Sequence, residues 1–155
     1  MDIDNRNKII GLVLWVVIIG LAYVLFDSIY TPYQQVVEQR KETEQVRDRM
    51  EAIRDALIQY QRDNETFPAN LDSLVSYLKT DSLMVARADS MYRRPAHIPF
   101  DADRFTFTIR ESGSRFEYAL NDTLRPQIYL LVDPDSDDKI GSLERTTMLN
   151  ASNWD

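Results

Sequence analysis

The sequence contains no cysteine, and this absence removes several kinds of site. Disulfide bonds, thiolate zinc sites, iron–sulfur clusters and cysteine nucleophiles all need a residue that the 155-residue chain lacks. The single histidine, His97, excludes a metal site built from several imidazoles, and its proline-bounded loop predicts an exposed side chain rather than a catalytic base. The four glycines lie too far apart to form a phosphate-binding loop. We therefore expect no enzymatic activity and no small-molecule substrate.

Basic residues are in the minority. The chain has 18 Lys and Arg against 25 Asp and Glu, so its formal net charge is -7 and its pI is near 4.7. Proteins bind a phosphate backbone mainly through clustered Lys and Arg, and this sequence has no such cluster. We therefore expect no nucleic-acid partner.

Charge is missing altogether from one long run near the N-terminus. Ile9 to Phe26 reads IIGLVLWVVIIGLAYVLF, eighteen residues without a charged side chain. A helix of this length spans roughly 27 Å, which is enough for the hydrocarbon core of a bilayer. A cleaved signal peptide is the alternative, but it would have a shorter apolar core and a small-x-small cleavage site, whereas FDSIYTPY follows here. We predict a transmembrane helix over residues 9–30.

The residues that flank this run predict its orientation. Arg6 and Lys8 lie just before it, and the next basic residues are Arg40 and Lys41. Lys and Arg close to a membrane span favour the cytoplasmic side. We therefore expect residues 1–8 to be cytoplasmic and the chain after the span to be exported.

Residues 31–66, which we call the stem, have the pattern of a long amphipathic helix. Pro32 is tolerated near a helix start or kinks a continuous helix. Further along, apolar or neutral residues recur at alternating steps of three and four: Val36, Gln39, Thr43, Val46, Met50, Ile53, Leu57 and Tyr60. Glutamine and threonine weaken the first half of this stripe. Two interpretations remain, a helix packed on its own domain and a self-associating coiled coil.

Residues 67–155, which we call the head, change from helical to strand periodicity. A helix is predicted over 71–79 with Asn70 or Asp72 as its cap, and one or two further turns after Thr80 or Asp81. Alternating residues then predict two strands, over 105–111 and 115–121. A more continuously apolar run predicts a third, central strand over 127–132. Short connections favour an antiparallel meander of three to four strands. The predicted fold class is α+β.

One motif at the end of the stem resembles a known family. The stretch ALIQYQRDNETFPANLDSLVSYL is similar to the segment that joins stem to head in type IV pilin-like proteins, particularly the major pseudopilins of type II secretion. Their pattern, roughly A-L-x-x-Y-x-x-D-N-x-x-[YF]-P-x-x-L-x-x-L, is matched by Ala56, Leu57, Tyr60, Asp63, Asn64, Phe67, Pro68, Leu71 and Leu74. The residues also make physical sense: the polar pair ends the helix, and the aromatic-proline pair folds the chain back onto it.

The resemblance implies a structural subunit of a secretion, pilus or related cell-envelope assembly. Such a protein would sit in the bacterial inner membrane, with its head in the periplasm. Its partners would be other membrane or pilin-like proteins, including copies of itself, met through the transmembrane and stem helix. The sequence departs from the family in two places, since no glycine precedes the apolar run at a matching position and no glutamate lies within it. These departures favour the alternative, an accessory or scaffold subunit of an unrelated membrane complex.

An acidic segment near the C-terminus has the spacing of a calcium loop. DPDSDDKIGSLE, residues 133–144, holds five carboxylates and one lysine, a net charge of -4. A twelve-residue calcium loop presents oxygens at alternate positions and ends on a glutamate. The predicted Ca²⁺ ligands are Asp133, Asp135, Asp137, the carbonyl of Lys139, and Glu144.

Position six of this loop departs from the calcium pattern. Asp138 stands where a glycine normally permits the sharp reversal of the backbone. The segment before the loop also reads as a strand rather than a helix. A solvated acidic turn between two strands is therefore the alternative to a calcium site.

Overall fold

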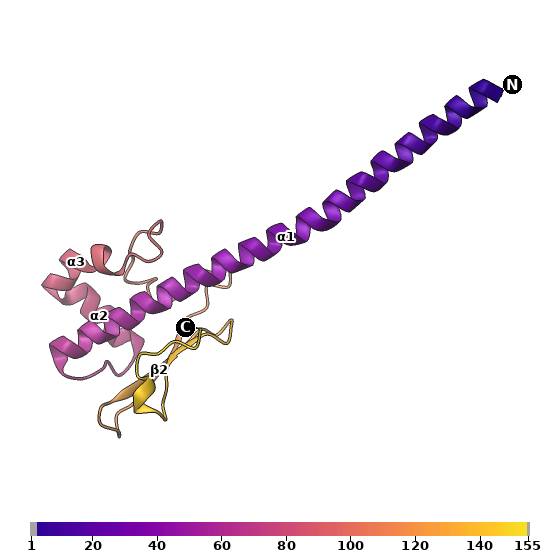
Figure 1. Ribbon diagram of the computed structural model, residues 1–155. Helices are drawn as coiled ribbons and strands as arrows, with labels where there is room; N and C mark the ends of the chain where they lie inside the picture. The colour runs from indigo at the N-terminus through magenta and orange to yellow at the C-terminus, as the bar shows by residue number, and fades with distance from the viewer. Residues whose placement is uncertain (1–2, 155) are drawn as a thin grey trace. The chain divides into compact units, whose positions relative to one another are not determined.

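The computed structural model describes residues 3–154, without the side chains of residues 3–6, 29, 31, 32 and 35 in its first helix. The predictions for Met1 and Asp2 lie outside the described residues. Within residues 3–154 the fold is α+β, with three helices, three strands and a short 3-10 turn (Figure 1). In chain order these are α1 (Ile3–Asn64), α2 (Leu71–Thr80), α3 (Ser82–Tyr92), β1 (Glu117–Asn121), β2 (Ile128–Val132), β3 (Lys139–Gly141) and the turn Thr146–Met148.

The chain divides into two compact units, Met1–Lys41 and Glu42–Asp155. We call them the smaller and the larger unit. Their boundary lies inside the predicted stem and inside α1, which is continuous through Pro32. The last third of α1 therefore belongs by its packing to the same unit as the head.

The smaller unit consists of the N-terminal part of α1. Its segment Asn7–Ser28, 22 residues long, is the only one among the described residues that is long and apolar enough to cross a membrane, and a signal sequence has the same properties. None of this segment is buried. Even Trp15 is 67% exposed, although tryptophan is ordinarily well buried in folded proteins.

The core of the larger unit forms around the second half of the predicted stripe on α1. Val46, Met50, Ile53 and Leu57 are all fully buried there, whereas Val36, in the smaller unit, is 46% exposed. This part of the stripe therefore packs on its own domain, as the first interpretation of the stem predicted. A coiled coil through the first half of the stripe stays a prediction.

The end of α1 and the return of the chain agree with the sequence motif. The helix ends at Asn64, and Glu65 follows with φ 61°, a left-handed residue of the kind that commonly ends helices. Phe67 is buried, and its ring centroid lies 5.0 Å from that of Tyr129 in β2. The backbone N–H of Phe67 donates to the side-chain oxygen of Gln127 at 3.1 Å, which also ties this loop to the sheet.

Both short helices begin at the side-chain caps that the sequence offered. The side-chain oxygen of Asn70 accepts from the Ser73 N–H at 2.8 Å at the start of α2. The Asp81 carboxylate accepts from two backbone N–H groups at the start of α3. With 11 residues, α3 is longer than the one or two turns predicted.

The sheet is a three-stranded antiparallel meander in the order β1-β2-β3. The prediction of a central strand is confirmed, since β2 pairs with both neighbours. The predicted strand 115–121 is shorter, because β1 begins at Glu117. The third strand, β3, lies within the segment that the sequence assigned to the calcium loop.

The strand predicted over residues 105–111 is wrong. Only an isolated bridge between Phe107 and Arg115 forms there, within a run of turns. The reason is tertiary packing: Phe105 is fully buried and contacts the rings of Tyr92 and Phe100, at centroid distances of 5.9 and 5.2 Å. Thr106, its neighbour, is buried as well, so the alternation of the sequence does not correspond to one buried and one exposed face.

The buried tyrosines predict a loss of stability at alkaline pH. Burial raises the pKa of Tyr92 to about 12, above the value near 10 of an unfolded chain. The folded state therefore keeps a proton that the unfolded state loses between these pKa values. The contribution of such a tyrosine to the free energy of unfolding is fully present below about pH 10. It falls as the pH rises toward 12, by about 1.4 kcal/mol per pH unit. We expect Tyr92→Phe to reduce this fall.

Denaturant unfolding of the full chain in detergent, repeated at rising pH, measures the effect. Tyr33→Phe is the matched control, because Tyr33 is 66% exposed. Equal pH dependence of the two variants would contradict the prediction.

Candidate functional site

The acidic segment forms the turn between β2 and β3. We call residues Asp133–Asp138 the acidic turn. The N–H of Asp133 donates to the carbonyl of Asp138 at 3.0 Å, which closes the turn just beyond the last paired residues, Val132 and Lys139. A turn that joins two antiparallel strands is what the alternative interpretation of this segment predicted.

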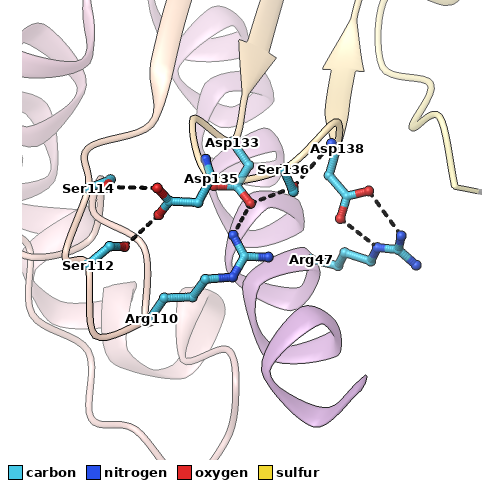
Figure 2. A network of polar contacts seen from close by, with 8 residues as sticks. All are labelled: Arg47, Arg110, Ser112, Ser114, Asp133, Asp135, Ser136 and Asp138. Atoms are coloured by element: carbon cyan, nitrogen blue, oxygen red, sulfur yellow. Dashed lines mark hydrogen bonds and ion pairs between the residues drawn. The ribbon is translucent and has the colours of Figure 1, made fainter. Parts of the chain in front are cut away.

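Asp133 is the most deeply placed carboxylate of this turn. Its side chain is fully buried and forms an ion pair with Arg110, whose side chain is 18% exposed (Figure 2). The Ser136 hydroxyl donates to the same carboxylate at 2.6 Å, and the N–H of Asp135 donates to its other oxygen at 3.2 Å. A buried carboxylate needs this many partners, because an unpaired buried charge is strongly destabilising.

Asp138 connects the turn to α1. Arg47 donates from Nε and Nη2 to the two oxygens of Asp138, at 2.8 and 3.0 Å, in the paired geometry that suits guanidinium and carboxylate (Figure 2). The same guanidinium lies 5.2 Å from the ring centroid of Trp154. Trp154 is half-buried and packs against the core of the larger unit.

Asp135 connects the turn to the loop before β1. The hydroxyls of Ser112 and Ser114 donate to its two oxygens at 2.5 and 3.1 Å (Figure 2). These two serines flank Gly113, whose N–H donates to the carbonyl of Arg110 at 3.0 Å. One short loop thus supplies Arg110 to Asp133 and two serine hydroxyls to Asp135.

Asn153 is bonded to the backbone of two further predicted ligands, Asp137 and Lys139. It exchanges two hydrogen bonds with the backbone of Lys139, donating its own N–H to the Lys139 carbonyl at 3.1 Å and accepting the Lys139 N–H at 2.9 Å. Its side-chain amide also donates to the Asp137 carbonyl at 2.8 Å. Asp137 and Glu144 themselves have exposed side chains.

As they lie here, the side chains of the predicted calcium ligands are not gathered around one point. Calcium takes six to eight oxygens that face one point. Asp133 and Asp135 are instead bonded to arginine and serine, and the Lys139 carbonyl accepts from Asn153. Among residues 3–154, no three acidic or imidazole side chains are grouped so as to hold a metal ion. Calcium binding stays a prediction, and it would require the pair between Arg110 and Asp133 to open.

Sequence reasoning missed the basic and hydroxyl partners of the turn. It treated Asp138 as a misfit in a calcium loop, whereas this residue makes the bidentate ion pair with Arg47, 91 positions away. Two signals were present in the sequence. Arg110 lies shortly before the turn S-G-S at 112–114, and Arg47 lies on the stem beside the buried stripe. Neither could be matched to its aspartate without the tertiary fold. His97 is exposed, as predicted.

Comparison with known proteins adds no relative. No protein-family model, no curated protein and no solved structure matches this chain.

Proposed function

We propose that this protein is a non-enzymatic, single-pass membrane-anchored structural subunit of a cell-envelope assembly, built like a pilin or pseudopilin. The observation that carries the proposal is the division of α1 between two environments. Its residues 9–26 are apolar and exposed, whereas residues 46–57 on the same helix supply the core of the larger unit. An apolar helix joined to a folded α+β unit is the arrangement of a membrane anchor with an attached head.

The exposed apolar surface supports the membrane assignment. From Ile9 to Phe26, every large apolar side chain is about half exposed or more. Apolar surface costs about 25 cal/mol per Å² in water, and a contiguous patch of this extent is uncommon on soluble proteins. Lipid or the helices of partner subunits would remove this cost. The proposed location is the bacterial inner membrane, with the N-terminus cytoplasmic and the larger unit in the periplasm.

A second candidate function is favoured by one feature of the apolar segment. It contains no glutamate, and in this it departs from the pilin-like pattern. An accessory or scaffold subunit of an unrelated membrane complex needs an anchor and an exported unit, but no repeated contact between its own stems. The two functions therefore differ in whether copies of the chain meet along the smaller unit.

Crosslinking in native membranes distinguishes these functions. The chain has no cysteine, so single cysteines can be placed at Ser28 and Arg40, both exposed in the smaller unit. For a pilin-like subunit we expect a short bis-maleimide to produce a ladder of dimers, trimers and larger species. Ala69→Cys is the matched control, because residue 69 is exposed and belongs to the larger unit.

Two other results of the crosslinking experiment would contradict the pilin-like function. A single adduct to a different protein, without a ladder, would contradict the pilin-like function and support the accessory one. A chain that is recovered in the soluble fraction without residues 1–28 would contradict both, because the apolar helix would then be a signal sequence.

A further inference from the structure

Aromatic side chains gather at the C-terminal end of the apolar run on α1. Four of them, Tyr23, Phe26, Tyr30 and Tyr33, form what we call the aromatic stripe. They are between 52% and 72% exposed, so none of them is packed in a protein core. The rings of Phe26 and Tyr30 stack on each other, with their centroids 5.5 Å apart. Residues 1–14 contain no aromatic residue, so the two ends of the run offer different side chains to their surroundings.

The aromatic stripe occupies one face of the helix. Its members follow one another at steps of three, four and three residues, and residues with this spacing lie above one another on the same side of an α-helix. The opposite face of the same segment carries smaller residues: Val13, Val17, Gly20, Val24 and Ser28. Small residues let transmembrane helices approach one another closely. The stripe, with its large rings, is therefore the face less suited to close contact with a neighbouring helix.

Charged residues limit the segment that can lie in the hydrocarbon core of a bilayer. Lys8 is the last charged residue before the apolar run, and Asp27 is the first one after it. The eighteen residues between them rise roughly 27 Å, and the hydrocarbon core is about 30 Å thick, so the run has no length to spare. A lysine can extend its long side chain to the interface, whereas the short side chain of an aspartate cannot. On the proposed topology, Asp27 therefore lies where the hydrocarbon core ends on the exported side.

This limit places the aromatic stripe at the boundary of the bilayer. Phe26 is the neighbour of Asp27 and lies where the hydrocarbon ends. Tyr30 is four residues further on, roughly 6 Å beyond Phe26, within a headgroup layer that is about 5–8 Å thick. Side chains on a helix lean toward its N-terminus, so the ring of Tyr33 leans back toward the same layer. A tyrosine suits this layer because its ring is apolar and its hydroxyl is polar.

We propose that the aromatic stripe binds the layer between headgroups and acyl chains in the leaflet on the exported side, and thereby fixes the depth of α1 in the bilayer. This inference rests on the proposed function, because it requires the apolar run to span a membrane. At the other end, Arg6 and Lys8 have long side chains that reach the interface from a range of depths. The aromatic stripe is therefore the part of the run that selects one depth.

Single tryptophans in lipid vesicles measure the position of the stripe. One full-length chain keeps Trp15 and carries Trp154→Phe, and a second carries Tyr30→Trp with Trp15→Phe and Trp154→Phe. Both are reconstituted in phosphatidylcholine vesicles that contain lipid brominated on its acyl chains. We expect the tryptophan of Tyr30→Trp to be quenched most by the shallow 4,5-dibromo lipid. Trp15 lies roughly 17 Å below Phe26, near the middle of the bilayer, and should be quenched most by the deep 11,12-dibromo lipid.

Removal of the rings tests whether they fix the depth. In the chain that keeps Trp15, Phe26→Leu with Tyr30→Leu retains apolar side chains but removes both rings. We expect the deep and the shallow lipid to quench Trp15 more equally in this variant, because the helix no longer has one preferred depth. Phe26→Tyr with Tyr30→Phe is the matched control, since it keeps two rings at the same positions and should leave the quenching profile unchanged. An unchanged profile in the leucine variant would overturn the proposal.

Three other results of the quenching experiment have different meanings. If no brominated lipid quenches Tyr30→Trp and the tryptophan is also shielded from acrylamide in the water, a second copy of the chain covers the stripe, and the proposal is overturned. If acrylamide quenches this tryptophan freely and no lipid does, the stripe lies in water, and the proposal is again overturned. If no lipid quenches Trp15 either, the chain does not insert, which contradicts the proposed function itself.

Discussion

Gly141→Ala is expected to lower the free energy of unfolding of the larger unit by about 3 kcal/mol or more. A Cβ at this position would lie 2.2 Å from the carbonyl oxygen of Tyr129 and 3.1 Å from that of Leu149. Both are backbone atoms, and Tyr129 belongs to the central strand β2, so its carbonyl cannot yield without disturbing the sheet. Gly141 also has φ +86°, which L-residues rarely adopt.

Gly113→Ala separates the steric effect from the backbone effect. Gly113 has φ +58°, but an added Cβ meets nothing within 4 Å. We expect this variant to lose only about 1 kcal/mol. Denaturant unfolding is followed by the emission of Trp154, in full-length chain that carries Trp15→Phe so that one tryptophan remains. Equal losses in the two variants would show that the clash at Gly141 is relieved by movement of the sheet.

Arg110→Met is expected to destabilise the larger unit by about 3–5 kcal/mol. The substitution keeps an unbranched side chain but removes the positive partner of Asp133, whose side chain is fully buried. Two neutral donors, from Ser136 and Asp135, would remain, and they do not neutralise the charge. The expected loss therefore comes from the carboxylate left behind, not from the attraction lost.

Two further variants test this explanation. Arg93→Met removes an exposed pair with Asp89, with 46% and 62% of the two side chains exposed, and should cost less than about 1 kcal/mol. Asp133→Asn, added to Arg110→Met, should recover part of the stability because it removes the buried charge. The opposite outcome is that the double variant loses as much stability as Arg110→Met and Asp133→Asn lose together when made singly. In that case the loss comes from the packing of Arg110, and the explanation fails.

Local signals in the sequence predicted most of the helical part. Asn70 and Asp81 are short polar residues in front of apolar runs, and each caps a helix as such residues do. The stripe through Met50 and Ile53 faces the core because its period is that of a helix. These features depend on residues within a few positions of one another, which is why a single sequence reveals them.

The features that the sequence did not reveal depend on distant residues. Phe105 lies in an aromatic cluster with Tyr92 and Phe100 instead of a strand. No pattern in the neighbouring sequence indicates that this packing replaces strand pairing. The same limit applies to the candidate sites. The carboxylates near the C-terminus were recognised, but Arg47 and Arg110, which bind two of them, lie 91 and 23 positions away.

The residues that pack together in the core are far apart in the sequence, and this affects how the protein folds during its synthesis. Residues 46–57 of α1 are made early, but the sheet that helps to cover them is completed only by β3 at residues 139–141, and Asp138 reaches Arg47 at the same stage. Contacts of such long range form slowly and late. On the proposed topology, a chain emerging from the membrane would stay open until β3 had been translocated. On that topology, delayed closure would keep the chain in a form that a translocation channel can pass, and it would leave the early apolar stripe for chaperones on the exported side to protect.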